Sequence, residues 1–327
     1  MSLVVLLPGD GIGPEVMAAA REVLRELAPD LELDERPFGG GAILELGTPL
    51  PDETLAACRD ADAVLLGAVG LPQFDAADVR PEQGLIGLRR ALDVYANLRP
   101  ARRDDIDLLV VRELVGGLYY GARGTRDDGT VFDTCEYHPS QVERIARRAF
   151  ELARTRRRRV ASVDKANVLE TSRMWRRVVS EVAGDYGDVE LEHVLVDNAA
   201  MQLVQAPERF DVIVTENTFG DILSDEAAAV TGGLGLAASA SLGDGAPGIF
   251  EPVHGSAPDI AGRGVANPAA MLRSTALMLE HGLGRPEPAR RLDAAVDAAL
   301  TRAQTPDVGG SATTADVTAA VLAELRR

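Results

Sequence analysis

Residues 210–228, FDVIVTENTFGDILSDEAA, decide the fold class of this chain. The segment opens with the contiguous β-branched residues 212–214, which predict a buried strand. Residues 216–220 then predict a turn, and a helix follows that carries Asp221 and Asp225. A buried strand that passes through a short turn into a helix is the repeating unit of α/β folds.

Asp221 and Asp225 are four residues apart, so their carboxylates project from one face of the expected helix. Two like charges at this spacing repel by roughly a few tenths of a kcal/mol on an isolated helix. A divalent cation such as Mg²⁺ or Mn²⁺ between them would turn the repulsion into binding. An acidic first turn stabilised by the helix dipole explains the same pair without a metal. Both interpretations stay open on this segment alone.

The composition limits the possible partners. The chain has 327 residues, 46% of them hydrophobic, and a formal net charge of -17. This is enough apolar sequence for one large or two ordinary domains. Because an acidic chain repels nucleic-acid backbones and anionic membranes, we expect neither as a partner. A small anionic substrate would have to meet a local cluster of positive charge.

Several features predict a cytoplasmic protein. Two cysteines, Cys58 and Cys135, cannot build a disulfide framework and suit a reducing compartment. The N-terminus lacks the basic segment of a signal peptide. The longest uncharged stretch, residues 227–243, is shorter than the ~20 apolar residues that a membrane span requires.

Lys165 is the single lysine among the 34 basic residues of Lys and Arg type. Arginine cannot release its proton in a protein, whereas a buried lysine can. The retention of one amine in a chain that otherwise uses arginine makes Lys165 a candidate base. A lysine that survives by chance on the surface is the alternative.

The N-terminal segment has the layout of a ligand-binding loop. Strand 3–7 runs through Gly9, Gly11 and Gly13 into a helix over residues 14–27. The glycines follow G-x-G-x-G and not the dinucleotide fingerprint G-x-G-x-x-G, so we do not expect a Rossmann fold.

Strands and helices alternate along the rest of the chain, which predicts an α/β fold with a largely parallel sheet. The remaining predicted strands are 63–70, 108–111, 160–163 and 191–196. The predicted helices are 84–95, 139–155, 172–182, 200–204, 269–283, 288–302 and 314–326, with loops or an extended arm over 116–133 and a loop over 243–268.

Several polar residues lie just past predicted strands, where α/β proteins gather their ligand groups. These residues are Asp10, Lys165, Asp197 and Asp221. We therefore expect them to contribute to one site.

Six motifs occur in order along the chain. They are GDGIGPE (9–15), NLRP (97–100), VREL-x-GG-x-Y (111–119), VDKANVLE (163–170), NTFGDILSD (217–225) and EPVHGSAPDIAG (251–262). Together they resemble the β-decarboxylating dehydrogenases of the isocitrate/isopropylmalate dehydrogenase family over nearly the whole chain. The isopropylmalate enzymes are the most similar branch.

The resemblance implies an α/β/α sandwich with a large mixed, mostly parallel sheet and two domains. Residues 1–94 and 233–327 would form the cofactor-binding domain. Residues 95–232 would bind substrate and metal and form a homodimer, with an arm near 116–138.

The resemblance also assigns roles to single residues. Substrate carboxylates would be held by Arg89, Arg99 and Arg112, since guanidinium groups pair bidentately with carboxylates. Lys165 would be the general base and Tyr119 the general acid, although the adjacent Tyr120 competes for the second role. Mg²⁺ or Mn²⁺ would be bound by Asp221, Asp225 and an Asp197 from the second subunit, which would also supply Lys165.

The family resemblance implies NAD as cofactor. The Asp259 carboxylate would accept the ribose hydroxyls and repel the 2′-phosphate of NADP. Relatives that use NADP carry Lys-Tyr where this chain has Asp259 and Ile260. Further cofactor contacts are expected from Ile12, Asn167, His254, Gly255 and Asn267.

Substrate choice would rest on Glu82, Leu85 and Ile86, because an apolar wall leaves a third carboxylate unpaired. The implied reaction is the oxidative decarboxylation of (2R,3S)-3-isopropylmalate to 4-methyl-2-oxopentanoate and CO₂ in leucine biosynthesis. Oxidation of D-malate or tartrate is the nearest alternative. A non-catalytic regulatory subunit is a further alternative, although the lysine, the tyrosine and the metal aspartates are all present.

One segment departs from the family pattern. After Pro100 the chain is short, whereas many isopropylmalate enzymes carry about a dozen more residues in a surface loop there. The arginines on both sides of the segment are retained, so we expect little effect on the chemistry, with a possible effect on domain closure.

Overall fold

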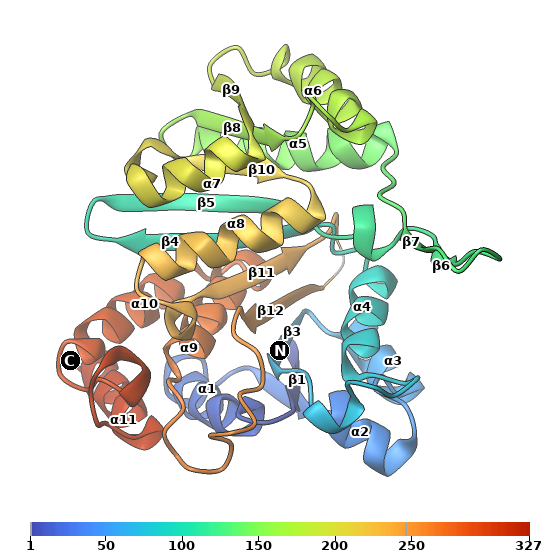
Figure 1. The fold of residues 1–327 in the computed structure, drawn as a ribbon. Coiled ribbons are helices and arrows are strands. Elements are labelled where there is room, and N and C mark those ends of the chain that lie inside the picture. The colour runs from blue at the N-terminus through green and yellow to red at the C-terminus, as the bar shows by residue number, and fades with distance from the viewer. Residues whose placement is uncertain (1, 246) are drawn as a thin grey trace. The chain divides into compact units, whose positions relative to one another are not determined.

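A computed structural model describes residues 2–245 and 247–327. The chain forms two compact units (Figure 1). Unit 1 comprises Met1–Val94 and Gly232–Arg327, and unit 2 comprises Tyr95–Thr231. No helix in the described part of the chain is both long and apolar enough to cross a membrane.

Unit 1 contains a mixed sheet with the strand order β2-β1-β3-β12-β11. β1, β2, β3 and β12 are parallel, and β11 is antiparallel to β12. The strands are β1 (Leu3–Gly9), β2 (Glu32–Glu35), β3 (Ala63–Ala68), β11 (Ala238–Leu242) and β12 (Gly248–Pro252). The helices are α1 (Gly13–Leu27), α2 (Gly39–Leu46), α3 (Asp52–Asp60), α4 (Pro81–Ala91), α9 (Ala269–Leu277), α10 (Pro286–Leu300) and α11 (Thr314–Leu325).

The sheet strands of unit 2 lie in the order β4-β5-β10-β8-β9 and are also mixed in direction. Only β4 is antiparallel to its neighbour there. The strands are β4 (Ala96–Arg103), β5 (Ile106–Glu113), β8 (Arg159–Asp164), β9 (Glu190–Leu195) and β10 (Val212–Thr215). The helices are α5 (Pro139–Arg154), α6 (Glu170–Ala183), α7 (Val196–Gln205) and α8 (Asn217–Val230). Helices α7 and α8 cover one face of this sheet and α5 and α6 the other (Figure 1).

The predicted α/β class with mostly parallel strands is confirmed, and the central strand β10 shows why. Val212, Ile213 and Val214 have no exposed surface, because helices cover both faces of their strand. Val110, Ile213 and Leu223 belong to the core that α8 forms with the sheet. Strands buried on both faces have contiguous apolar residues, which is the pattern that predicted this element.

Three strands of unit 1 were not predicted from the sequence, namely β2, β11 and β12. β12 lies inside the segment 243–268, which was predicted to be a loop, and β11 lies inside the uncharged stretch 227–243. β12 is only five residues long and ends at Pro252, yet Ile249 and Phe250 are fully buried. So short an apolar run between turn residues gives no strand signal by itself, and the pairing with β3 and β11 stabilises the strand.

The segment after Pro100 forms a tight hairpin between β4 and β5. Arg103 pairs with Ile106, so Asp104 and Asp105 alone make the turn. Asp104 has a φ of 51°, in the left-handed region that two-residue hairpin turns require. β4 was not predicted as a strand, and it pairs with β5 along its whole length.

The segment 116–133 includes a small hairpin. β6 (Arg123–Thr125) and β7 (Val131–Asp133) pair as a separate two-stranded antiparallel sheet. The hairpin extends away from the body of unit 2 (Figure 1). Val131 at the start of β7 is 74% exposed, so the hairpin contributes apolar surface to solvent.

Asp10 has a structural position in unit 1, although it lies just past a strand as expected for a site residue. Its carboxylate is 3% exposed and accepts N–H groups from Gly40 (2.9 Å), Gly41 (3.1 Å) and Gly70 (2.9 Å). The first two N–H groups belong to the first turn of α2, whose N-cap residue makes no side-chain bond of its own. Asp10 therefore caps α2 from a distant part of the chain.

Asp10→Ala should destabilise the protein by about 2–5 kcal/mol, because three N–H groups lose their acceptor. Chemical denaturation measures this change, and Asp52→Ala, in the exposed first turn of α3, is the matched control. A loss no larger than that of the control would contradict the capping role.

Candidate functional site

Helix α8 carries the candidate site of unit 2 and begins earlier than predicted. It starts at Asn217 directly after β10, and the Glu216 carboxylate caps it by accepting the Phe219 N–H at 2.8 Å. Asp221 therefore lies in the second turn, and the first turn has no acidic residue. An acidic helix start stabilised by the dipole does not describe this helix.

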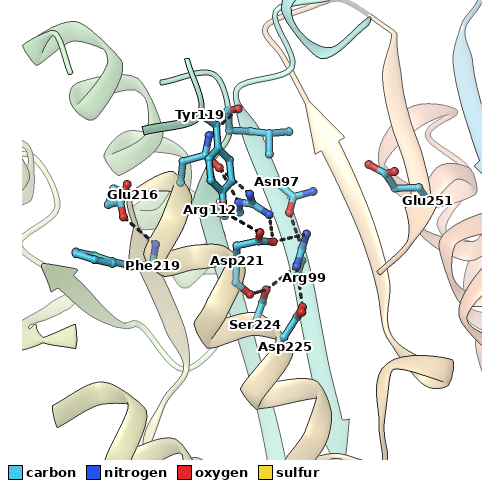
Figure 2. A network of polar contacts seen from close by, with 12 residues as sticks. Asn97, Arg99, Arg112, Tyr119, Glu216, Phe219, Asp221, Ser224, Asp225 and Glu251 are labelled. Atoms are coloured by element: carbon cyan, nitrogen blue, oxygen red, sulfur yellow. Dashed lines mark hydrogen bonds and ion pairs between the residues drawn. The ribbon is translucent and has the colours of Figure 1, made fainter. Parts of the chain in front are cut away.

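Three side chains converge on the Asp221 carboxylate (Figure 2). Arg112 bonds its Oδ1, and the Nη2 of Arg99 lies 3.3 Å from the same oxygen. The Tyr119 hydroxyl donates to Oδ2 at 3.2 Å. Unit 2 thus brings together four of the residues that the sequence singled out, counting Asp221 itself.

Arg99 also reaches the second aspartate. Its Nη1 lies 3.2 Å from the Asp225 carboxylate and donates to the Ser224 hydroxyl at 2.7 Å, while its Nε donates to Asn97 at 2.8 Å. Asn97 and Ser224 were not predicted as site residues. Both lie inside quoted motifs, but no chemical property of either residue type distinguishes it in the sequence.

The register of the β4–β5 hairpin explains why the two arginines meet α8. Asn97 lies opposite Arg112, and Arg99 is two residues further along β4. All three side chains therefore project from one face of the sheet, the face that α8 covers. At Gly220, a Cβ atom would lie 2.6 Å from the Arg112 side chain, so only glycine allows the helix to pass this closely.

The environment raises the pKa of two acidic groups in the site, Tyr119 and Asp225. Burial raises the pKa of the Tyr119 hydroxyl, and the negative charge of Asp221 adds to the effect. Burial also raises the pKa of the Asp225 carboxyl; Arg99 opposes the shift and Asp221 reinforces it. Tyr119 accordingly keeps its proton and can act as a donor.

Lys165 and Asp197 form a separate pair in unit 2. Lys165 follows β8, Asp197 lies in the first turn of α7, and the Lys165 amine lies 2.6 Å from the Asp197 carboxylate. This hydrogen bond lowers the pKa of Asp197. Among residues 2–245 and 247–327, no three His, Cys, Asp or Glu side chains are grouped as a metal site, so Asp197 does not join Asp221 and Asp225 within one chain.

The Asp221 and Asp225 pair fits a divalent cation in its chemistry. Both side chains offer carboxylate oxygens, the ligands that Mg²⁺ and Mn²⁺ prefer. Their side chains are 36% and 50% exposed, so a cation can approach from solvent. In the chain alone, the charges of Arg99 and Arg112 balance the two carboxylates.

Helix α4 of unit 1 carries the predicted substrate wall. The helix spans Pro81–Ala91 and therefore begins three residues before the predicted start. Glu82, Leu85, Ile86 and Arg89 are spaced as one helical face. Leu85 and Ile86 are partly buried, and Arg89 donates to the Glu251 carboxylate at 2.7 Å. Glu251 was not predicted as a site residue.

The loop after β12 contains most of the predicted cofactor contacts. The Ile12 N–H donates to the Ser256 carbonyl at 2.8 Å, which holds this loop against the glycine loop after β1. Asp259 and Gly255 are exposed. The Asn267 amide is tied to Asp307 (3.1 Å) and Ala269 (3.0 Å). Asn167, in unit 2, is exposed.

His254 has an unfilled hydrogen-bonding position. Its Nδ1 lies 2.9 Å from the Gly255 carbonyl, whereas its Nε2 is shielded from solvent and has no hydrogen-bond partner. Burial lowers the pKa of this imidazole, so it is neutral near pH 7. Because Nδ1 must donate to the Gly255 carbonyl, the neutral Nε2 can only accept a hydrogen bond, which fits a ribose hydroxyl or the exocyclic amino group in the adenosine part of a dinucleotide.

Known proteins of one family are similar to this chain over nearly its whole length. A family model described as "Isocitrate/isopropylmalate dehydrogenase" matches residues 3–321. The 3-isopropylmalate dehydrogenase of Streptococcus pneumoniae is 50% identical over 342 residues, covering 98% of this chain and 99% of the relative. That of Halalkalibacterium halodurans is 53% identical over 322 residues, covering 91% and 89%.

Solved structures give the same result. Isocitrate dehydrogenase from Methylococcus capsulatus has a TM-score of 0.93 at 39% identity, with both chains fully covered. A β-decarboxylating dehydrogenase from Thermococcus kodakarensis has a TM-score of 0.88 at 40% identity, covering 100% of this chain and 96% of that one. The chain therefore belongs to the isocitrate/isopropylmalate dehydrogenase family.

Proposed function

We propose that this chain catalyses the NAD-dependent oxidative decarboxylation of (2R,3S)-3-isopropylmalate to 4-methyl-2-oxopentanoate and CO₂, the reaction used in leucine biosynthesis. The observation that carries the proposal is the convergence of Arg99, Arg112 and Tyr119 on Asp221. It combines groups for carboxylate binding, proton donation and cation binding in one place.

The substrate assignment rests on the α4 wall and on the relatives. Leu85 and Ile86 offer apolar surface where a substrate with a third carboxylate would need a cation. The relatives named 3-isopropylmalate dehydrogenase are 50% and 53% identical to this chain, whereas the isocitrate dehydrogenase of known structure is 39% identical. Both comparisons favour a substrate with an alkyl group over isocitrate.

The three arginines, Lys165 and Tyr119 have separate roles in the proposed reaction. Arg89, Arg99 and Arg112 bind and orient the two carboxylates of the substrate. Lys165 removes the proton of the C2 hydroxyl as the C2 hydride leaves, after which the bond from C3 to its carboxylate breaks and releases CO₂. Tyr119 then gives its proton to C3.

A divalent cation and NAD would supply the rest of the chemistry. Asp221, Asp225 and Asp197 of the partner subunit would hold a divalent cation, which would supply charge stabilisation for the substrate oxygens, and bound NAD would supply the hydride acceptor. Asp259 and His254 would hold the adenosine end of NAD.

We also propose that the active form is a homodimer. Met201 and Val204 on α7 and Ile222 on α8 are 51%, 63% and 61% exposed. The two helices pack together on one face of unit 2 (Figure 1), so these residues give that face an apolar surface suited to a second copy. Lys165 and Asp197 would then reach the site of the other subunit.

The direct test is NADH formation from 3-isopropylmalate, with and without a chelator, and with NADP in place of NAD. We expect kcat/KM for 3-isopropylmalate to exceed that for D-malate at least about tenfold, because the apolar wall is empty with the smaller substrate. NADP should be a poor cofactor, and the chelator should abolish turnover. A higher kcat/KM for D-malate would overturn the substrate assignment.

The shared site predicts complementation between inactive variants. Lys165→Ala should lower kcat by about 10²–10⁴-fold, the usual contribution of a general base. Co-expression with Tyr119→Phe should restore about a quarter of wild-type activity, because half of the dimers are hybrids with one complete site of two. Hybrids of Lys165→Ala with Asp197→Asn should stay inactive, since each of their sites lacks one group. Equal activity of both mixtures would contradict a shared site.

Metal binding should weaken as the pH falls. The raised pKa of Asp225 means that this carboxyl takes up its proton at a higher pH than an ordinary aspartate, and a protonated carboxyl is a poor ligand. Calorimetric titration with Mn²⁺ from about pH 7.5 down to about pH 4, near the ordinary aspartate pKa, should show the loss. Asp225→Asn should bind weakly at every pH, and Asp52→Asn should match the wild type. An affinity that is constant over this range would refute the assignment.

A further inference from the structure

Asn217 connects the Arg112 side chain to the backbone that leads to Tyr119. It is the first residue of α8 and is 1% exposed. Its Oδ1 accepts N–H groups from Nε (2.9 Å) and Nη2 (2.7 Å) of Arg112. Its Nδ2 donates to the carbonyls of Leu114 (3.1 Å) and Gly116 (3.0 Å). The amide thus uses both lone pairs and both protons, and its orientation is fixed because guanidinium groups only donate and carbonyls only accept.

The two bonds to Asn217 set the direction of the Arg112 guanidinium. They engage the Nε and Nη2 edge of the planar group, which leaves Nη1 directed at Asp221. Two bonds from one edge of the planar guanidinium to the same oxygen restrict its rotation. Arg112 would therefore present the same edge to a substrate carboxylate in every molecule.

The two hydrogen bonds from the Asn217 amide to carbonyls hold the chain segment that precedes Tyr119. Glu113 is fully buried, and its carboxylate accepts the N–H groups of Val115 (3.2 Å) and Gly116 (2.9 Å). Asn217 binds the carbonyls of the same short segment. The N–H groups of residues 115 and 116 are bound by Glu113, and the carbonyls of residues 114 and 116 are bound by Asn217. Two buried side chains therefore hold this segment in place.

Tyr119 follows this segment within one turn of chain. Gly117 has a φ of +74° and starts the one-turn 3₁₀ helix η2 (Gly117–Tyr119). Only two residues separate the anchored Gly116 from Tyr119, so a shift of the anchor moves the phenol relative to Asp221. A displacement of about 1 Å at a reacting group can lower the rate about 10²-fold.

We infer that Asn217 is a positioning residue that fixes the Arg112 guanidinium and the Tyr119 turn at the same time, with Glu113 as a second anchor of the turn. The inference deepens the proposed function and rests on it for the roles of Arg112 and Tyr119. It assigns to the first residue of α8 a task that neither the residue type nor its spacing reveals.

Steady-state kinetics with 3-isopropylmalate separates the two effects. Asn217→Ala should raise KM about tenfold through Arg112 and lower kcat about tenfold through Tyr119. Glu113→Gln replaces one acceptor of the turn by a donor and leaves the bonds of Arg112 to Asn217 in place. It should lower kcat about tenfold with KM within about twofold of the wild type.

A double-mutant cycle tests whether Asn217 acts through Tyr119. In the Tyr119→Phe background, Asn217→Ala should lower kcat by less than about twofold further, because the group being positioned is already gone. Full additivity of the two kcat effects would overturn the inference, and so would an unchanged KM in Asn217→Ala. Thr54→Val removes a buried hydrogen bond to the Pro37 carbonyl in unit 1 and controls for a general loss of stability.

Hydrogen exchange provides a measurement that does not need turnover. The peptide over residues 114–120 should exchange at least about tenfold faster in both Asn217→Ala and Glu113→Gln, and at the wild-type rate in Thr54→Val. Unchanged exchange in the first two variants overturns the inference even if the wild type fails to oxidise 3-isopropylmalate. That failure alone would instead overturn the proposed function.

Discussion

The pairing of buried guanidinium groups with the carboxylates of α8 is the constraint on which the site of unit 2 depends. The side chains of Arg99 and Arg112 are 10% and 3% exposed, and neither can become neutral by losing its proton. Each therefore needs a partner that stays anionic, since an unpaired buried charge is strongly destabilising. Asp221 and Asp225 provide it, and the arginines in turn allow two carboxylates to lie one helical turn apart. A substrate carboxylate would replace an aspartate as the partner of an arginine, and a cation would replace an arginine as the partner of an aspartate. No unpaired charge would then enter an apolar interior.

Acidic residues that each follow a strand in the sequence have different roles in the structure. Asp10 and Asp221 each follow a strand, but three backbone N–H groups satisfy Asp10, and its surroundings leave no role in chemistry. Glu15 is similar, because its carboxylate accepts the N–H groups of Gly264 (3.3 Å) and Ala266 (3.0 Å) and holds their loop against α1. The first motif of the chain thus holds the loops of unit 1 in place, whereas the fifth carries the two carboxylates of the candidate site.

The sequence predicted those parts of the molecule whose pattern is local. Contiguous β-branched residues identified β10, and the i,i+4 spacing singled out Asp221 and Asp225, whereas both arginines of unit 2 came from the family resemblance. β4 was missed because its sequence, ANLRPARR, contains a proline and several charged residues, and β11 and β12 were missed because each has only five residues. Asn97, Asn217, Ser224 and Glu251 were missed for a different reason: an amide, a hydroxyl or a carboxylate shows its task only when its partners are known.

The β4–β5 hairpin shows how a change of length can leave a site intact. The alignment with the Streptococcus pneumoniae enzyme spans 342 residues, more than the 327 of this chain, so that relative carries residues that are absent here. In this chain the β4–β5 connection is a turn of two residues, and the register that places Asn97 opposite Arg112 is set by pairing along eight residues of each strand. The turn and the strand pairing together fix the register of a hairpin, and a two-residue turn allows the fewest registers. The relative placement of Arg99 and Arg112 depends on this register. A longer connection is compatible with the same site only if the two strands still pair in the same register.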